Sequence, residues 1–154
     1  MSRALIEAVR DAAVRTFRDA LGREVTPLPP QPSPAESSVF QTSVIISFVG
    51  AISGAFALRC SRKTGAAIAA QMLGTEVPET SDDMKDAVGE FLNMVVGDAK
   101  TRFSTDGEAF RISVPTTVVG DRYVLHVSSG GSDTVSTLWF GFGSEALCIE
   151  IYLK

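Results

Sequence analysis

The N-terminal segment shows the apolar spacing of an amphipathic helix. From Ser2 to Leu21 the apolar residues recur at steps of three and four, which places them on one face of a helix. They are Leu5, Ile6, Val9, Ala13, Phe17 and Leu21. Gly22 follows, and glycine is typical just after a helix C-terminus. The pattern predicts a helix over Ser2–Leu21.

A proline-rich stretch and two strand-like runs come next. Residues 26–36 hold five prolines, which cannot continue a helix and favour extended backbone. We expect a surface connector there, with an SH3-type ligand as the alternative. Val39–Val49 and Ala55–Cys60 are rich in Val, Ile and Phe and flank a glycine-bounded turn. This arrangement predicts an antiparallel hairpin.

The same region is uncharged between Glu36 and Arg59, which is long enough for a helix that crosses a bilayer. Its many serines, its β-branched residues and the pair Gly50 and Gly54 argue for strands instead. We therefore expect a buried hairpin and no association with a membrane.

Two further helices are predicted in the middle of the chain. Ser61 can cap an alanine-rich helix over Arg62–Leu73, which Gly74 ends. A longer helix is expected over Asp82–Phe103, because acidic residues in its first turn suit the positive end of the helix dipole.

The rest of the chain, after Phe103, consists of strand-like runs separated by glycine-containing turns. The runs are Phe110–Val119, Tyr123–Ser128, Thr134–Phe142 and Ala146–Leu153. Helices and antiparallel strands in separate blocks predict an α+β fold of two layers. In this fold an antiparallel sheet, made of the hairpin and a C-terminal meander, packs against long helices. We expect one domain over residues 1–154.

Composition and charge narrow the possible functions. With 45% hydrophobic and 21% charged residues the chain has the make-up of a folded protein. Its net charge is -4 and the sequence contains no cluster of basic residues, so we expect no binding to nucleic acid. The charged N-terminus leaves no apolar core for a secretory signal, which predicts a cytoplasmic protein.

Few residues are available for metal or nucleophilic chemistry. Cys60 and Cys148 are expected to be reduced core residues, and His126 is the sole histidine. A site built on several imidazoles is thus excluded within one chain, and we expect no metal. A Cys/His hydrolase would pair His126 with one of the cysteines, but no third orienting residue is evident.

The helix over Asp82–Phe103 has two distinct faces at about 100° per residue. Its apolar face consists of Met84, Val88, Phe91, Leu92, Val95, Val96, Ala99 and Phe103. The opposite stripe consists of Asp86, Gly89, Glu90, Asn93, Gly97 and Lys100. Because each glycine within a helix costs about 1 kcal/mol relative to alanine, we expect a closely packed neighbour over this stripe.

Glu90 and Asn93 alone are compatible with a solvent-facing pair, but the wider pattern is more specific. Asp86-x-x-x-Glu90-x-x-Asn93, followed by Gly97 and, after a strand, by Pro115, resembles the signature of the CheC/CheX/FliY family of chemotaxis phosphatases. The resemblance covers nearly the whole chain. It includes Ile6–Val25, Ile45–Phe56, Gln71–Gly74 and Ile112–Pro115.

This resemblance implies removal of phosphate from the aspartyl phosphate of a CheY-like response regulator. Asn93 would orient the attacking water, and Glu90 would pair with the regulator's lysine. Asp86 would make an outer docking contact or serve only as an acidic residue that suits the start of the helix dipole, and Gly89 and Gly97 would let the surface of the docked regulator approach the helix. Pro115 is expected to shape a strand edge. The protein would need no cofactor of its own, since Mg²⁺ belongs to the regulator.

Two further implications concern the type of family member. Two-site family members carry a second set of acidic and asparagine residues on the first helix. In this chain the corresponding positions, four and seven residues after Asp11, are occupied by Arg15 and Arg18. One site per chain resembles CheX, and this type joins sheets in a homodimer. The alternative function is a module of the same fold that binds a response regulator or a flagellar switch protein without hydrolysis. Trp139 is expected in the core, or else in an exposed patch or dimer contact.

Overall fold

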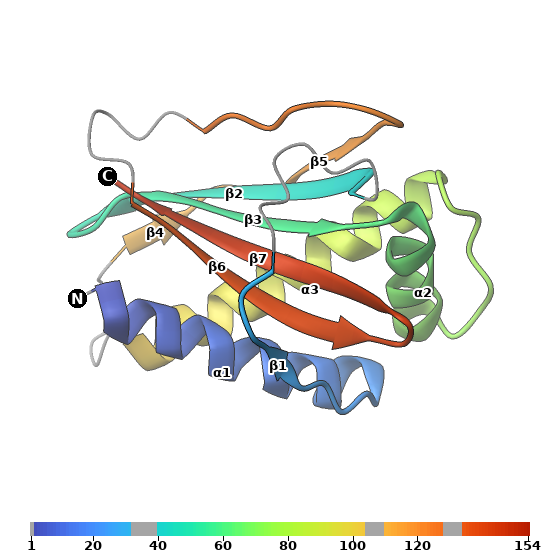
Figure 1. Cartoon of the computed structure of the whole chain (residues 1–154), viewed down its shortest axis with the longest axis horizontal. Helices are drawn as coiled ribbons and strands as arrows, with labels where there is room; N and C mark the ends of the chain where they lie inside the picture. The colour runs from blue at the N-terminus through green and yellow to red at the C-terminus, as the bar shows by residue number, and fades with distance from the viewer. Residues whose placement is uncertain (1, 32–39, 104–109, 128–133) are drawn as a thin grey trace.

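The computed structural model describes residues 2–31, 40–103, 110–127 and 134–154. Three helices lie in these ranges: α1 (Ser2–Leu21), α2 (Arg62–Leu73) and α3 (Asp82–Phe103). The strands are β1 (Pro27–Leu28), β2 (Thr42–Gly50), β3 (Gly54–Cys60), β4 (Phe110–Ile112), β5 (Thr116–Val119), β6 (Thr134–Phe142) and β7 (Glu145–Leu153). Figure 1 shows the helices on one side of a twisted sheet. The α+β fold class and the bounds of the three helices are confirmed.

The sheet, within the described residues, has the order β1-β6-β7-β3-β2-β4, and β5 also pairs with β2. Its pairings are antiparallel. The predicted hairpin is β2–β3, in which Val44 lies opposite Leu58. The turn of the hairpin is shorter than predicted, because Gly50 and Gly54 belong to the strands. Val39, at the predicted start of the first strand, lies outside the described residues.

The predicted C-terminal meander is wrong in its first half. The run Phe110–Val119 is split into β4 and β5, and both pair with β2. Pro115 lies in the break and has no backbone N–H to donate to a ladder. Ser113 still bonds to β2, since its N–H donates to the Ser47 carbonyl at 2.9 Å and its Oγ accepts from the Ser47 N–H at 2.9 Å.

The predicted strand Tyr123–Ser128 is not formed over residues 123–127, and Ser128 lies outside the described part. The segment nevertheless keeps strand-like alternation, because Val124 and His126 are exposed while their neighbours are partly buried. Leu125 and Val127 pack against Ala57 and its neighbours on the sheet face away from the helices. The apolar side of the segment is therefore buried by packing onto the sheet rather than by joining it.

Part of the proline-rich connector is ordered as an edge strand. Pro27 and Leu28 of β1 lie opposite Phe140 and Trp139 of β6. Proline is tolerated on an edge strand because its missing donor can face solvent. Residues 32–36 of the expected connector lie outside the described residues.

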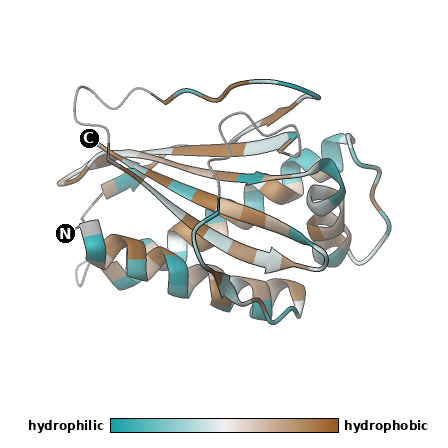
Figure 2. Cartoon of the chain, viewed as in Figure 1, coloured by the Kyte–Doolittle hydropathy of each residue, from teal (hydrophilic) through white to brown (hydrophobic). Residues whose placement is uncertain are grey.

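The main core fills the space between the helices and the sheet, where Figure 2 shows apolar residues on the facing sides. The predicted apolar face of α3 is buried there, with Phe103 partly so. Phe17 of α1 packs against Phe91 of α3 with ring centroids 4.8 Å apart. Aromatic pairs at this separation add to the free energy gained from burial.

The opposite sheet face carries a smaller cluster in which Trp139 and Cys148 are buried with Phe40. The expectation that Trp139 is a core residue is confirmed. Cys60 and Cys148 are both free and buried, and burial raises the pKa of the Cys60 thiol to about 12. His126 is exposed while both thiols are buried, which argues against the Cys/His alternative.

Candidate functional site

Helix α3 carries the candidate site, and its local sequence explains where it begins. Ser81 caps it, because its Oγ accepts a hydrogen bond from the Met84 N–H at 3.1 Å. Asp82 and Asp83 lie in the first turn, while Lys100 and Arg102 lie in the last. These charges complement the helix dipole and therefore stabilise the first and last turns of α3.

The polar stripe of α3 faces away from the core, as its periodicity indicates. Asp86 and Glu90 are exposed, and Asn93 and Gly97 are partly exposed. A helix brings residues three and four apart onto one face, so Glu90 and Asn93 lie side by side on this surface. Both are accessible to a partner protein.

Gly89, in contrast, is buried within the chain. A Cβ at this position would lie 3.4 Å from the Cβ of Pro115 and 3.4 Å from Oγ1 of Thr117. The expectation of a closely packed neighbour is correct here, but the neighbour is the segment between β4 and β5. The structure thus corrects the expectation that Gly89 leaves room for a partner, because Pro115 already fills that room.

Gly97 differs from Gly89 because a Cβ there would meet nothing within 4 Å among the described residues. The space above it is open to solvent. The approach of a partner to this position stays a prediction.

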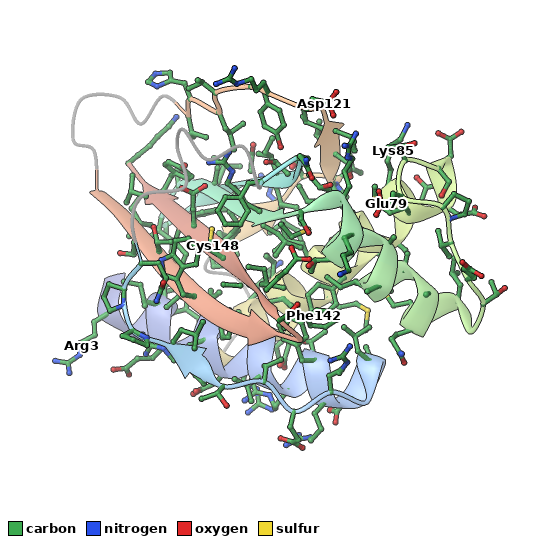
Figure 3. All side chains as sticks on the ribbon, turned by 45° about the vertical axis from the view of Figure 1, so that its right-hand side comes forward. Arg3, Glu79, Lys85, Asp121, Phe142 and Cys148 are labelled. Atoms are coloured by element: carbon green, nitrogen blue, oxygen red, sulfur yellow. The ribbon has the colours of Figure 1, made fainter. Side chains whose placement is uncertain are left out.

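Thr117 ties β5 to the helix, a contact that the sequence analysis did not identify. Its Oγ1 donates to the backbone carbonyl of Lys85 at 3.2 Å. Lys85 lies one turn before Gly89, near the start of α3 (Figure 3). Together with Pro115, this bond holds the strand segment against one side of the polar stripe. No local pattern predicts it, because residues 32 positions apart are joined.

The other side of the stripe borders α1. Arg15 of α1 donates from Nε and from a terminal nitrogen to Oδ2 of Asp98, at 3.0 and 2.8 Å. Arg102 donates from Nε to Oδ1 of the same carboxylate at 3.2 Å. The stripe with Glu90 and Asn93 is therefore exposed between two walls, one made by Pro115 and one by α1.

Two further properties concern metals and membranes. Among the side chains that the structure describes, no three His, Cys, Asp or Glu residues are grouped so that they could hold a metal ion. Over the same residues, each helix is too short or too polar to span a bilayer.

The chain belongs to the CheX family. Residues 42–137 match the family described as "Chemotaxis phosphatase CheX", and this match covers more than half of the chain, including all of α3. Among curated protein sequences, none matches the chain significantly.

Solved structures show the same fold. A CheC-like superfamily protein from Shewanella sp. PV-4 superposes with a TM-score of 0.86 at 23% identity, covering 100% of this chain and 99% of that one. The chemotaxis protein CheX from Vibrio vulnificus has a TM-score of 0.82 at 23% identity, covering 97% and 99%. The CheX–CheY–BeF3–Mg²⁺ complex from Borrelia burgdorferi contains a chain with a TM-score of 0.76 at 21% identity, covering 97% of each.

Proposed function

We propose that this protein hydrolyses the aspartyl phosphate of a CheY-like response regulator. The observation that carries the proposal is the exposed pair Glu90 and Asn93 on α3, in a chain of the CheX family. The Borrelia burgdorferi complex, in which a CheX of similar fold is bound to CheY with BeF3 and Mg²⁺, supports the choice of partner.

Asn93 is proposed to orient the attacking water. An aspartyl phosphate is a mixed anhydride, so its hydrolysis chiefly requires a water aligned with the bond that breaks. A carboxamide can donate one hydrogen bond and accept another, which fixes both the position and the direction of a water. A carboxylate at the same place would be repelled by the phosphoryl oxygens.

Glu90 is proposed to dock the regulator by pairing with the lysine of its phosphorylation site. One turn of helix separates Glu90 from Asn93, so a lysine held by Glu90 sets the position of the phosphoryl group relative to the water. Asp86 would make an outer contact, and Gly97 would allow close approach. The Mg²⁺ would be the regulator's own, and the protein would act without a cofactor.

This function also implies an environment and an assembly. Response regulators are cytoplasmic, so we propose the same location for this protein. We further propose a homodimer of the single-domain chain. Strand β6 has nine residues, and among the described residues β1 pairs with two of them. A strand edge that is left unpaired favours pairing with another strand.

The proposal is tested by phosphate release. CheY-like regulators from the same organism are phosphorylated with acetyl phosphate and Mg²⁺, freed of excess acetyl phosphate, and incubated with and without the protein. We expect faster loss of the phosphoryl group from at least one regulator. A regulator that binds but keeps its phosphate would instead support the non-catalytic binding module.

A further inference from the structure

The hydroxyl of Thr117 bonds to the helix turn that carries two of the proposed site residues. Oγ1 of Thr117 in β5 donates to the Lys85 carbonyl of α3 at 3.2 Å. Within an α-helix that carbonyl also accepts from the N–H of Gly89, one turn further on, and a carbonyl oxygen has lone pairs for two donors. Asp86 and Glu90 lie directly after these two helix residues. The bond therefore joins β5 to the turn that bears both exposed carboxylates.

Thr117 faces the helices, whereas its neighbour Thr116 faces the other way. Thr117 lies opposite Val44 of β2, which is fully buried in the main core. Thr116 is exposed, because adjacent residues of a strand point to opposite faces. A valine at either position keeps the branched shape that strands favour and lacks the hydroxyl. The two threonines are thus a matched pair, one on the helix side and one on the exposed side.

The wall that Pro115 forms beside the site is bonded both before and after the proline. Pro115 lies in the break between β4 and β5 and belongs to neither strand. Before it, Ser113 is bonded to Ser47 of β2. After it, Thr117 is bonded to Lys85 of α3. The first contact holds the wall to the sheet, and the second holds it to the helix that carries the site.

A regulator bound at Glu90 and Asn93 would contact both the helix and this wall. Pro115 packs against Gly89, the residue just before Glu90, and Val114 beside the proline is 82% exposed. A standard protein interface covers roughly 800 Å² on each partner, a patch with a radius of roughly 16 Å. Such a patch extends well beyond one helix turn. The arrangement of wall and helix is therefore part of the surface that the regulator meets.

We propose that Thr117 is a positioning residue, whose hydroxyl fixes the Pro115 wall relative to the Glu90 turn and thereby sets the affinity for the regulator. The inference rests on the proposed function and deepens it. A surface that is already in its bound arrangement loses less conformational freedom on binding, which strengthens affinity. Once the regulator is bound, turnover depends on Asn93 and not on Thr117.

The test compares Thr117→Val and Thr117→Ser with a matched control, Thr116→Val. Steady-state phosphate release is measured against the concentration of the phosphorylated regulator that the wild type dephosphorylates fastest. Binding of the BeF3-activated regulator and a melting curve are measured separately for each variant. Thr117→Ala also lacks the hydroxyl, and it replaces Thr117→Val in the comparison if the valine variant does not fold.

We expect Thr117→Val to raise KM and Kd by about threefold to tenfold, which corresponds to the net contribution of one hydrogen bond. Its kcat should stay within about twofold of wild type. Thr117→Ser keeps the hydroxyl and should recover most of the affinity. Thr116→Val makes the same chemical change on the exposed side of β5 and should behave as the wild type.

Unchanged KM and Kd in Thr117→Val, with an active wild type, would overturn this inference and leave the proposed function standing. This holds even if the melting temperature falls, since the bond would then act on folding alone. An equal loss of affinity in Thr116→Val, or no recovery in Thr117→Ser, would also refute the role of the hydroxyl. A wild type that neither binds nor dephosphorylates any regulator would remove both proposals.

Discussion

Gly89 and Pro115 lie so close that a Cβ added to the glycine would be 3.4 Å from the Cβ of the proline. Asp86 and Asn93 are three and four residues from Gly89 on the same helix, so the proline lies among the residues of the polar stripe. One side of the candidate site is therefore built from a segment that follows α3 in sequence and returns to it through pairing with β2.

The two glycines of the stripe should respond differently to substitution by alanine. Gly97→Ala should raise the free energy of unfolding by about 1 kcal/mol, because alanine is the better helix former and the site is open. Gly89→Ala should gain less, since its Cβ meets Pro115 and Thr117. Urea denaturation measures both, and an equal gain in the two variants would contradict the close packing at Gly89.

A larger side chain at position 89 should displace Pro115. Gly89→Leu is expected to lower the free energy of unfolding by about 1–3 kcal/mol, the usual cost of overpacking. Gly97→Leu is the matched control and should raise the free energy of unfolding, because leucine is also a better helix former than glycine and the site is open. If Gly89→Leu is as stable as Gly97→Leu, the contact with Pro115 is not restrictive.

Asn93→Ala should separate chemistry from folding. We expect kcat for phosphate release to fall by about 10- to 1000-fold, the effect of removing one aligned hydrogen bond. Affinity for the regulator and the melting temperature should stay near wild type, because Asn93 lies outside the core. A collapse of the melting temperature would make the residue structural.

Glu90→Ala should act mainly on docking. If Glu90 pairs with the regulator's lysine, its loss should raise KM as well as lower turnover. Asp86→Ala should have a smaller effect than either substitution. The measurement is phosphate release against regulator concentration, and wild-type rates in Glu90→Ala and Asn93→Ala would exclude this helix face from the mechanism.

The proposed homodimer has a direct physical test. Val135 of β6 lies outside the part that β1 pairs with among the described residues, and it is 45% exposed, which is consistent with an edge that another chain covers. Sedimentation at micromolar concentration should give twice the chain mass of 16.4 kDa. A single species of 16.4 kDa would rule out the dimer under these conditions.

The buried pair Arg59 and Glu150 should make stability depend on pH. Arg59 is 1% exposed, and its NH1 lies 3.9 Å from Oε1 of Glu150. Burial raises the pKa of the Glu150 carboxyl above its ordinary value of 4.5, although Arg59 opposes the shift. The unfolded chain therefore loses this proton first as pH rises.

Because the pKa of Glu150 is higher in the folded than in the unfolded protein, ionisation of this carboxyl favours unfolding. The free energy of unfolding therefore falls as pH increases from 4.5 towards the pKa of the folded state. Glu150→Gln should remove that decline, so the melting temperature of the variant minus that of the wild type should increase as pH rises above 4.5. Because the substitution also leaves Arg59 without a carboxylate, the slope with pH is the informative quantity. Identical slopes in both proteins would refute the assignment.

Local patterns in the sequence were sufficient for the helices, the hairpin and the polar stripe. Helical contacts join residues three and four apart, so periodicity and caps such as Ser81 already define the element and its faces. For this reason the exposure of Glu90 and Asn93 follows from their spacing alone. The resemblance to the CheX family also rests on these local residues.

Long-range partners could not be predicted in the same way. Whether Tyr123–Val127 joins a sheet or packs on its face depends on which surface is free to bury its apolar side. Likewise, Arg15 pairs with Asp98 across 83 positions, a contact that no local spacing encodes.

The sequence by itself thus determined the helices, the α+β class and, apart from the buried Gly89, the polar stripe of α3 that faces away from the core. Tertiary structure alone decided that Pro115 covers Gly89 and that Arg15 of α1 pairs with Asp98 of α3. The physical reason is that helix periodicity is a property of neighbouring residues, whereas sheet pairing and packing depend on distant segments competing for the same surface.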